Sequence, residues 1–174
     1  MDTIVDKINY DLIEILSFLK DNEKISLLNN ADMFLKKVML LSAASYFESE
    51  IIDILLNFTS IKSNNDQQLI SFVENKAILR QYHTYFDWEK SNANKFFSLF
   101  GEDFKNEMSN LVKNDIELNE SIKAFLELGN LRNLLAHKNF GAYNLDQNFN
   151  DIYELYKKAK YFTEYLNNKF LNNN

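Results

Sequence analysis

The residues best suited to chemistry lie in one short segment, RNLLAH at positions 132–137. It contains one of the two arginines and one of the two histidines in the chain, Arg132 and His137. An imidazole titrates near neutral pH and can accept or donate a proton, whereas a guanidinium holds phosphate oxygens in a planar fork. RNA supplies its own nucleophile in the 2′-hydroxyl group. This pair of side chains therefore has the chemistry needed to cleave RNA without a metal ion.

Each residue of the segment has an expected role in such a reaction. His137 would remove the proton of the 2′-hydroxyl or protonate the leaving 5′-oxygen, and Arg132 would stabilise the charge that grows on the phosphate. Asn133 shares a helical face with His137 and would position the substrate or a partner motif. The alternative is structural, because two cations near the C-terminal end of a helix also interact favourably with its dipole.

A strong helical pattern is expected to hold this segment in place. The helix is predicted over residues 118–138, with Ala124, Leu128, Leu131 and Leu135 on the side opposite the polar residues. Burial of those side chains would anchor the helix in a core and leave the polar segment on a rigid support.

A second long helix, predicted over residues 31–57 with Asn29 and Asn30 as caps, contributes another candidate. Glu48 and Ser45 fall on its apolar side, where a carboxylate needs a partner. We expect Glu48 to contact Arg132 and orient the guanidinium. A partly exposed glutamate at a helix–helix seam is the alternative.

Two further groups of residues allow both functional and structural interpretations. Arg80 and His83 lie among aromatic side chains that could stack nucleobases, although such a cluster is more often a packed connection. Several lysines could contact phosphate, and otherwise they are solvated surface: Lys36, Lys37, Lys138, Lys157, Lys158 and Lys160. Lys138, directly after His137, is the RNA-binding candidate among them.

The rest of the chain favours helices. It has no proline, no cysteine and three glycines among 174 residues, too few for the tight turns of a β-sandwich or an α/β fold. Helical spacing also appears in four other segments: up to Lys20, over 67–79, over 97–111 with a break at Gly101, and over 149–171. Between them, residues 63–66 are predicted to form a polar loop, and residues 80–94 a packed turn or short helix. The prediction is one all-α domain over residues 1–174, a bundle of about five to seven helices.

Composition excludes several classes of function. Two histidines without cysteine, HxH or HExxH spacing give no metal site, and no glycine-rich phosphate loop is present, so no cofactor is expected. The absence of cysteine fits the cytoplasm, and the first 20 residues are too often charged to form a signal peptide or a membrane span. A net charge of −6 gives no general attraction for nucleic acid, so RNA binding must depend on a local cleft.

The string LRNLLAHKNFG resembles the signature of the HEPN superfamily, in which four to six residues separate an arginine from a histidine and a polar residue commonly follows the arginine directly. Arg132, Asn133 and His137 fill these places as RNxxxH. The order of three segments is similar to that in the RiboL-PSP-HEPN branch: LLSAASYFESEI comes first, FDWEKSNANKFFSLFG follows, and the RN…AH helix comes late.

The resemblance implies a helical bundle that acts as a metal-independent endoribonuclease, often in toxin–antitoxin or antiviral defence systems, with an antitoxin or other regulatory protein as partner. It also implies a homodimer that brings two RNxxxH motifs into one cleft, where one histidine can serve as base and the other as acid. Some HEPN toxins carry a tyrosine two residues after the histidine, which a nucleotidyltransferase modifies; Asn139 stands there instead. The alternatives are a non-catalytic HEPN-like module that binds RNA or protein, and a structural subunit of a defence complex.

Overall fold

The computed structural model describes residues 2–171, and within them all regular structure is helical. The all-α prediction is confirmed, and the six helices of seven residues or more agree with the predicted five to seven. In chain order the elements are α1 (Ile4–Asp21), α2 (Ile25–Lys62), α3 (Gln67–Val73), the π-helical turn η1 (Glu74–Ile78), α4 (Tyr82–Tyr85), α5 (Asn94–Ser98), α6 (Glu102–Asn114), α7 (Ile116–His137) and α8 (Phe149–Leu171).

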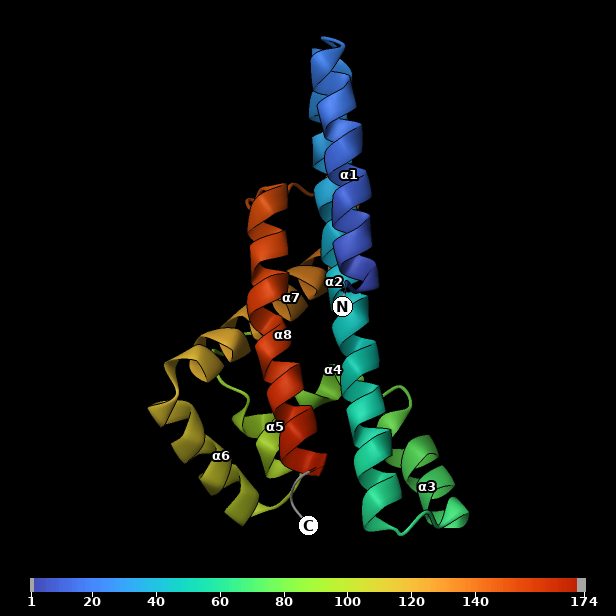
Figure 1. Ribbon diagram of the computed structural model, residues 1–174, viewed down its shortest axis with the longest axis vertical. Helices are drawn as coiled ribbons and strands as arrows, with labels where there is room; N and C mark the ends of the chain where they lie inside the picture. Colours follow the sequence, from blue (N-terminus) through green and yellow to red (C-terminus); the bar gives the residue numbers. More distant parts are fainter. Residues whose placement is uncertain (1, 172–174) are drawn as a thin grey trace.

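The long helices set the shape of the molecule. α1 runs antiparallel to the first half of α2, and this pair rises as an arm above the rest of the structure (Figure 1). α8 lies along α2, and α7 passes behind α8 to reach α2 about halfway along its length (Figure 1). The end of α7 that carries the RNxxxH residues is therefore brought to the middle of α2.

α2 is longer than its sequence pattern suggests. It begins at Ile25 rather than near residue 31, so Asn29 and Asn30 lie inside the helix and the prediction that they cap it is wrong. The start is set by the tight reversal after α1, where Glu23 adopts a φ of 54°, and not by a side-chain cap. At the other end, residues 63–66 form the expected polar loop, and Asp66 caps α3 by accepting from the amide of Leu69.

α1 packs against the rest of the structure through one narrow face. Val5, Asn9 and Leu12 are buried, whereas Ile4 and Ile15 face solvent. Polar contacts tie the start of the helix to α8, because Tyr156 shares a hydrogen bond with Thr3 and the Tyr153 hydroxyl donates to Asp6 Oδ1 at 2.9 Å. The rest of the arm exposes many apolar side chains, namely Tyr10, Ile13, Phe18, Ile25, Leu27, Phe34 and Val38.

Aromatic side chains fill the core below the arm. The rings of Phe47, Phe86 and Phe162 each lie within 6 Å of that of Phe125, centroid to centroid. Gly101, with a φ of 98°, separates α5 from α6 as its position in the pattern predicted. No helix between residues 2 and 171 combines the length and apolarity needed to cross a bilayer.

Candidate active site

The site is built on the last turns of α7. Asp115 caps the start of this helix by accepting from the amide of Leu118 at 2.9 Å. Leu128, Leu131 and Leu135 are buried as predicted, so the helix is fixed along one side. Its predicted end near residue 138 agrees with the observed last residue, His137.

The guanidinium of Arg132 lies between two partners. Its Nη1 donates to Asn133 Oδ1 at 3.1 Å, and its Nη2 lies 3.6 Å from Glu48 Oε2 on α2. The side chains of Arg132 and Glu48 are 38% and 39% exposed, so the pair is at the surface and an incoming phosphate can reach it. The structure thus contains the contact expected between Glu48 and Arg132. Ser45, predicted on the same side of α2 as Glu48, is exposed beside Ile4, Ile8 and Leu41 instead.

A packed aromatic layer lies next to this ion pair. Burial raises the pKa of Tyr82 far above its usual range; the negative charge of Glu48 raises it further, and the positive charge of Arg132 opposes the change. Tyr82 therefore stays neutral beside the pair. Its ring lies 5.4 Å from that of Trp88, and Trp88 rests on α7 at Gly129, where an added Cβ would lie 2.1 Å from the indole carbons. One sign of this contact is visible in the sequence: Gly129 lies inside a strong helical pattern, where glycine costs about 1 kcal/mol relative to alanine.

His137 lies apart from these contacts. It is exposed, and no side-chain hydrogen bond or ion pair joins its imidazole to Arg132 or to any other described residue. By helical geometry it lies about 40° from Asn133 around α7, so both point toward the same side. The exposed apolar side chains of Leu134 (38%) and Phe140 (43%) lie nearby in the sequence.

Two buried lysines hold the connection that follows His137. Lys36 Nζ donates to the carbonyl of Leu145 and Lys37 Nζ to that of Phe140, both at 2.6 Å. Lys37 is fully buried, with its ammonium 5.1 Å from the ring centre of Phe140 and 5.6 Å from that of Phe34. These lysines cannot serve as surface phosphate contacts, so that interpretation of the sequence is wrong. No helical pattern marks them, because α2 is apolar on all sides at this point.

The residues after His137 form an ordered turn. Lys138 is exposed and free to contact a ligand at the end of α7. Asn139, in the place of the tyrosine of some HEPN toxins, accepts from the amide of Gly141 through Oδ1 at 3.1 Å and from that of Tyr143 through its carbonyl at 2.8 Å. Asn139 thus has a local structural role.

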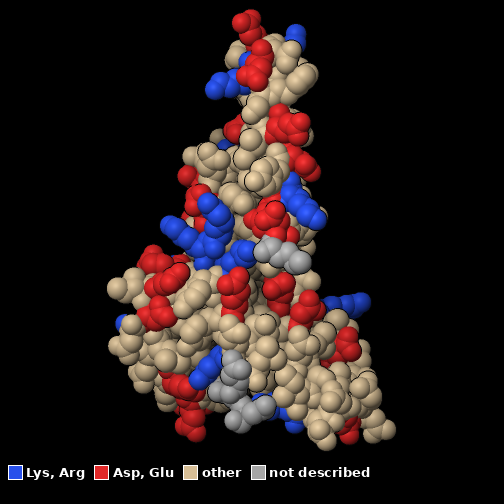
Figure 2. All heavy atoms as spheres, in the orientation of Figure 1, with Lys and Arg blue, Asp and Glu red and all other residues tan. Residues whose placement is uncertain are grey.

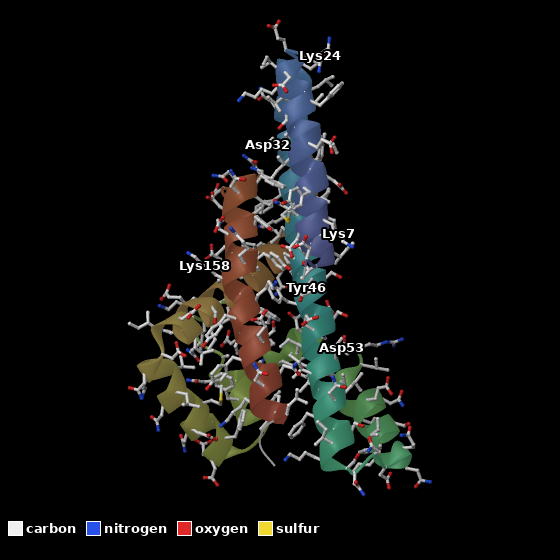
Figure 3. All side chains as sticks on the ribbon, viewed as in Figure 1. Lys7, Lys24, Asp32, Tyr46, Asp53 and Lys158 are labelled. Atoms are coloured by element: carbon white, nitrogen blue, oxygen red, sulfur yellow. The ribbon has the colours of Figure 1, made fainter. Side chains whose placement is uncertain are left out.

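The other candidate groups lie elsewhere. Tyr82, Tyr85 and Phe86 are buried, so the aromatic cluster is a packed connection, with Arg80 and His83 exposed at its edge. A group of basic side chains is visible over the middle of α8 (Figure 2), where the exposed Lys158 lies (Figure 3). Between residues 2 and 171, no three His, Asp or Glu side chains gather in a way that could hold a metal ion.

A helical bundle with Arg, Asn and His at this spacing on a late helix has the features of a HEPN domain. The family model described as RiboL-PSP-HEPN matches residues 6–172. The chain therefore belongs to the RiboL-PSP-HEPN family, and the resemblance of its motif to that family is confirmed. Searches of curated proteins and of solved structures gave no match.

Proposed function

We propose that this protein is a metal-independent endoribonuclease in which His137 and Arg132 carry out the reaction. The observation that supports this most is the arrangement at the end of α7. The Arg132 guanidinium is held at the surface between Asn133 and Glu48, and an imidazole with no competing partner among the described residues lies little more than one helical turn away.

The reaction transfers the phosphate within the RNA. A histidine removes the proton of the 2′-hydroxyl, whose oxygen then forms a bond to phosphorus. The bond from phosphorus to the 5′-oxygen breaks, and that oxygen takes a proton from the acid. Arg132 stabilises the negative charge on the non-bridging oxygens, and the products are a 2′,3′-cyclic phosphate and a 5′-hydroxyl. Lys138 adds a phosphate contact at the end of the helix.

The active form in this proposal is a homodimer. One imidazole cannot easily act as base and acid in the same step, whereas two related by a two-fold axis can share the roles. The lack of a contact between His137 and Arg132 within one chain supports a site completed by a second copy. Leu134 and Phe140 supply exposed apolar surface near His137 for such an association. A toxin or antiviral effector is the biological role that fits this activity.

A cleavage assay in EDTA tests the proposal. Wild-type protein should cut single-stranded RNA, and His137→Ala or Arg132→Ala should abolish the cutting while the helical circular dichroism spectrum is unchanged. His83→Ala, which removes the other histidine, is the matched control and should cut normally. Cleavage that survives both substitutions, or that requires Mg²⁺, contradicts the mechanism. Binding of RNA without cleavage by the wild type would favour a non-catalytic HEPN module.

A further inference from the structure

A polar cleft of about 450 Å³ lies against α7 on the N-terminal side of the motif. It is lined by Trp88, Glu89, Lys90, Ser91, Asn92, Lys123, Glu127 and Asn130. Its volume is within the range of about 300–1,000 Å³ that is typical of small-ligand sites in proteins. The contact of Trp88 with Gly129 brings the following segment, residues 89–92, against α7 and forms the cleft.

The cleft opens on the side of α7 that carries His137. At about 100° per residue, Asn130 and His137 differ by only ~20° around the helix axis and lie about 10 Å apart along it. Glu127 and Lys123 continue the same stripe, about one and two turns further back. An RNA strand that places its phosphate at His137 and follows this side of α7 would therefore pass over the cleft.

The charges in the cleft favour hydrogen-bond donors over phosphate. Lys90 is paired with Asp87 at 3.0 Å, and Lys123 with Glu120 at 2.7 Å. Among the described residues, no ion pair or hydrogen bond engages the carboxylates of Glu89 and Glu127. Free carboxylates repel phosphate and accept hydrogen bonds from the exocyclic amino groups of bases.

We propose that this cleft is a nucleobase subsite that takes a base with an exocyclic amino group and disfavours uracil. Glu127 accepts from the amino group, and the side-chain amide of Asn130 can donate to a ring nitrogen or carbonyl. The inference rests on the proposed ribonuclease function, since it is RNA held at the motif that extends over the cleft. It gives the enzyme a preference for the sequence next to the cleaved bond.

The only tryptophan of the chain lines the cleft, which provides a direct probe. Trp88 fluorescence is measured while full-length protein is titrated with 2′-O-methyl hexacytidylate or hexauridylate. Neither can be cleaved, since the nucleophile is blocked, and cytosine carries an amino group where uracil carries a carbonyl. Hexacytidylate should bind with a Kd at least about tenfold lower, as one discriminating base contact allows. Glu127→Gln should remove most of this preference, and Glu117→Gln, on the same helix outside the cleft, should keep it.

Equal Kd values for the two oligonucleotides, an unchanged preference in Glu127→Gln, or no response of Trp88 to either oligonucleotide would overturn the subsite. These outcomes are independent of cleavage. If the wild type binds hexacytidylate preferentially but cuts no RNA, the subsite stands and the ribonuclease proposal fails. If the wild type cuts RNA in EDTA while Trp88 does not respond to either oligonucleotide, the ribonuclease proposal stands and the subsite fails.

Discussion

At the scale of single residues, the contact of Glu48 with Arg132 can orient the guanidinium while contributing little to the stability of the fold. The contact to Glu48 is long, at 3.6 Å, and more than a third of each side chain is exposed. Exposed ion pairs contribute little to folding, in the range of about 0.2–1 kcal/mol. The same contact can still determine where the guanidinium points, because Asn133 holds only one of its two terminal nitrogens.

Replacing Glu48 with glutamine tests this distinction. We expect kcat for RNA cleavage to fall about tenfold, since the charge-assisted contact that orients the fork is lost. The free energy of unfolding should change by less than about 1 kcal/mol, as for other exposed pairs. Steady-state kinetics and urea unfolding measure the two quantities, with the exposed Asp53→Asn of the same helix as control. Unchanged kcat in Glu48→Gln would remove Glu48 from the site.

Gly129 is the residue whose size matters most next to the motif. Alanine would favour the helix by about 1 kcal/mol, but its Cβ would overlap the Trp88 indole, which must move. We expect Gly129→Ala to be destabilised by about 1–3 kcal/mol, as for other overpacked sites, with a shift in Trp88 fluorescence. In Gly141→Ala the nearest atom is 3.5 Å away, and this control should be unaffected. A Gly129→Ala protein as stable as wild type would show that the close packing is absent in solution.

At the scale of elements, two helices other than α7 fix the surroundings of the site. α2 contributes Glu48 to the site and, about three turns earlier in the helix, the buried lysines that hold the connection between α7 and α8. α8 in turn holds the start of α1 through Tyr153 and Tyr156. The connection that follows His137 is thus held by side chains far from it in the sequence.

Lys37→Met tests the first of these links. Methionine keeps an unbranched apolar side chain of similar length but leaves the carbonyl of Phe140 without its donor, so we expect a loss of about 1–3 kcal/mol in stability. Amide exchange in residues 138–146 should become faster than in the wild type, whereas exchange in the centre of α7 should change less. Lys158→Met, at an exposed position of α8, is the control. Unchanged exchange in residues 138–146 would mean that Lys37 does not hold this connection.

Asp6 makes the attachment of α1 to α8 dependent on pH. Burial alone would raise its pKa, but hydrogen bonds from the Thr3 amide and hydroxyl and from the Tyr153 hydroxyl lower the pKa below its ordinary value. A carboxyl with a lowered pKa stabilises the folded state at neutral pH, and this contribution is lost as the pH falls below about 4. Asp6→Asn should therefore be less stable than wild type at pH 7, with a smaller difference at pH 3. Urea unfolding at both values, with Asp11→Asn as control, measures this, and a difference that grows in acid would contradict it.

At the scale of the whole molecule, one chain holds the groups of the proposed site apart. Its imidazole and guanidinium are not in contact, and apolar surface is exposed near the end of α7 and along the arm. Both features follow if the working unit contains two copies of the motif. In such a dimer, the rate of RNA cleavage depends on how many of the two His137 side chains are functional.

Mixed dimers test whether both His137 side chains are needed. Wild-type and His137→Ala chains with different tags can be co-expressed and the heterodimer isolated by two affinity steps. We expect its activity to lie at least about tenfold below that of the wild-type dimer, because acid and base catalysis together contribute far more than a factor of two. A heterodimer with half the wild-type activity would show that each chain acts alone. Wild-type protein that sediments as a monomer while active would exclude the dimer.

The fold was largely predictable because its helices have regular apolar spacing, and α8 was predicted over its observed range. The start of α2 was not, since it depends on the packing of α1 and not on a local cap. Within the site, the contact of Glu48 with Arg132 could be expected from a carboxylate on an apolar face. The roles of Lys37, Tyr82 and Gly129 could not, because each depends on residues more than 30 positions away that only tertiary packing brings close.

A single substituted nucleotide tests whether the RNxxxH segment cleaves RNA through attack by the 2′-hydroxyl of the RNA itself. A synthetic RNA is cut in EDTA, the cleaved bond is mapped, and a second RNA with a single 2′-deoxynucleotide on the 5′ side of that bond is compared with it. We predict that wild-type protein cuts the first RNA to a 2′,3′-cyclic phosphate, that it leaves the modified bond intact, and that His137→Ala cuts neither. Cleavage at the deoxy position, or equal cleavage by wild type and His137→Ala, would contradict the account.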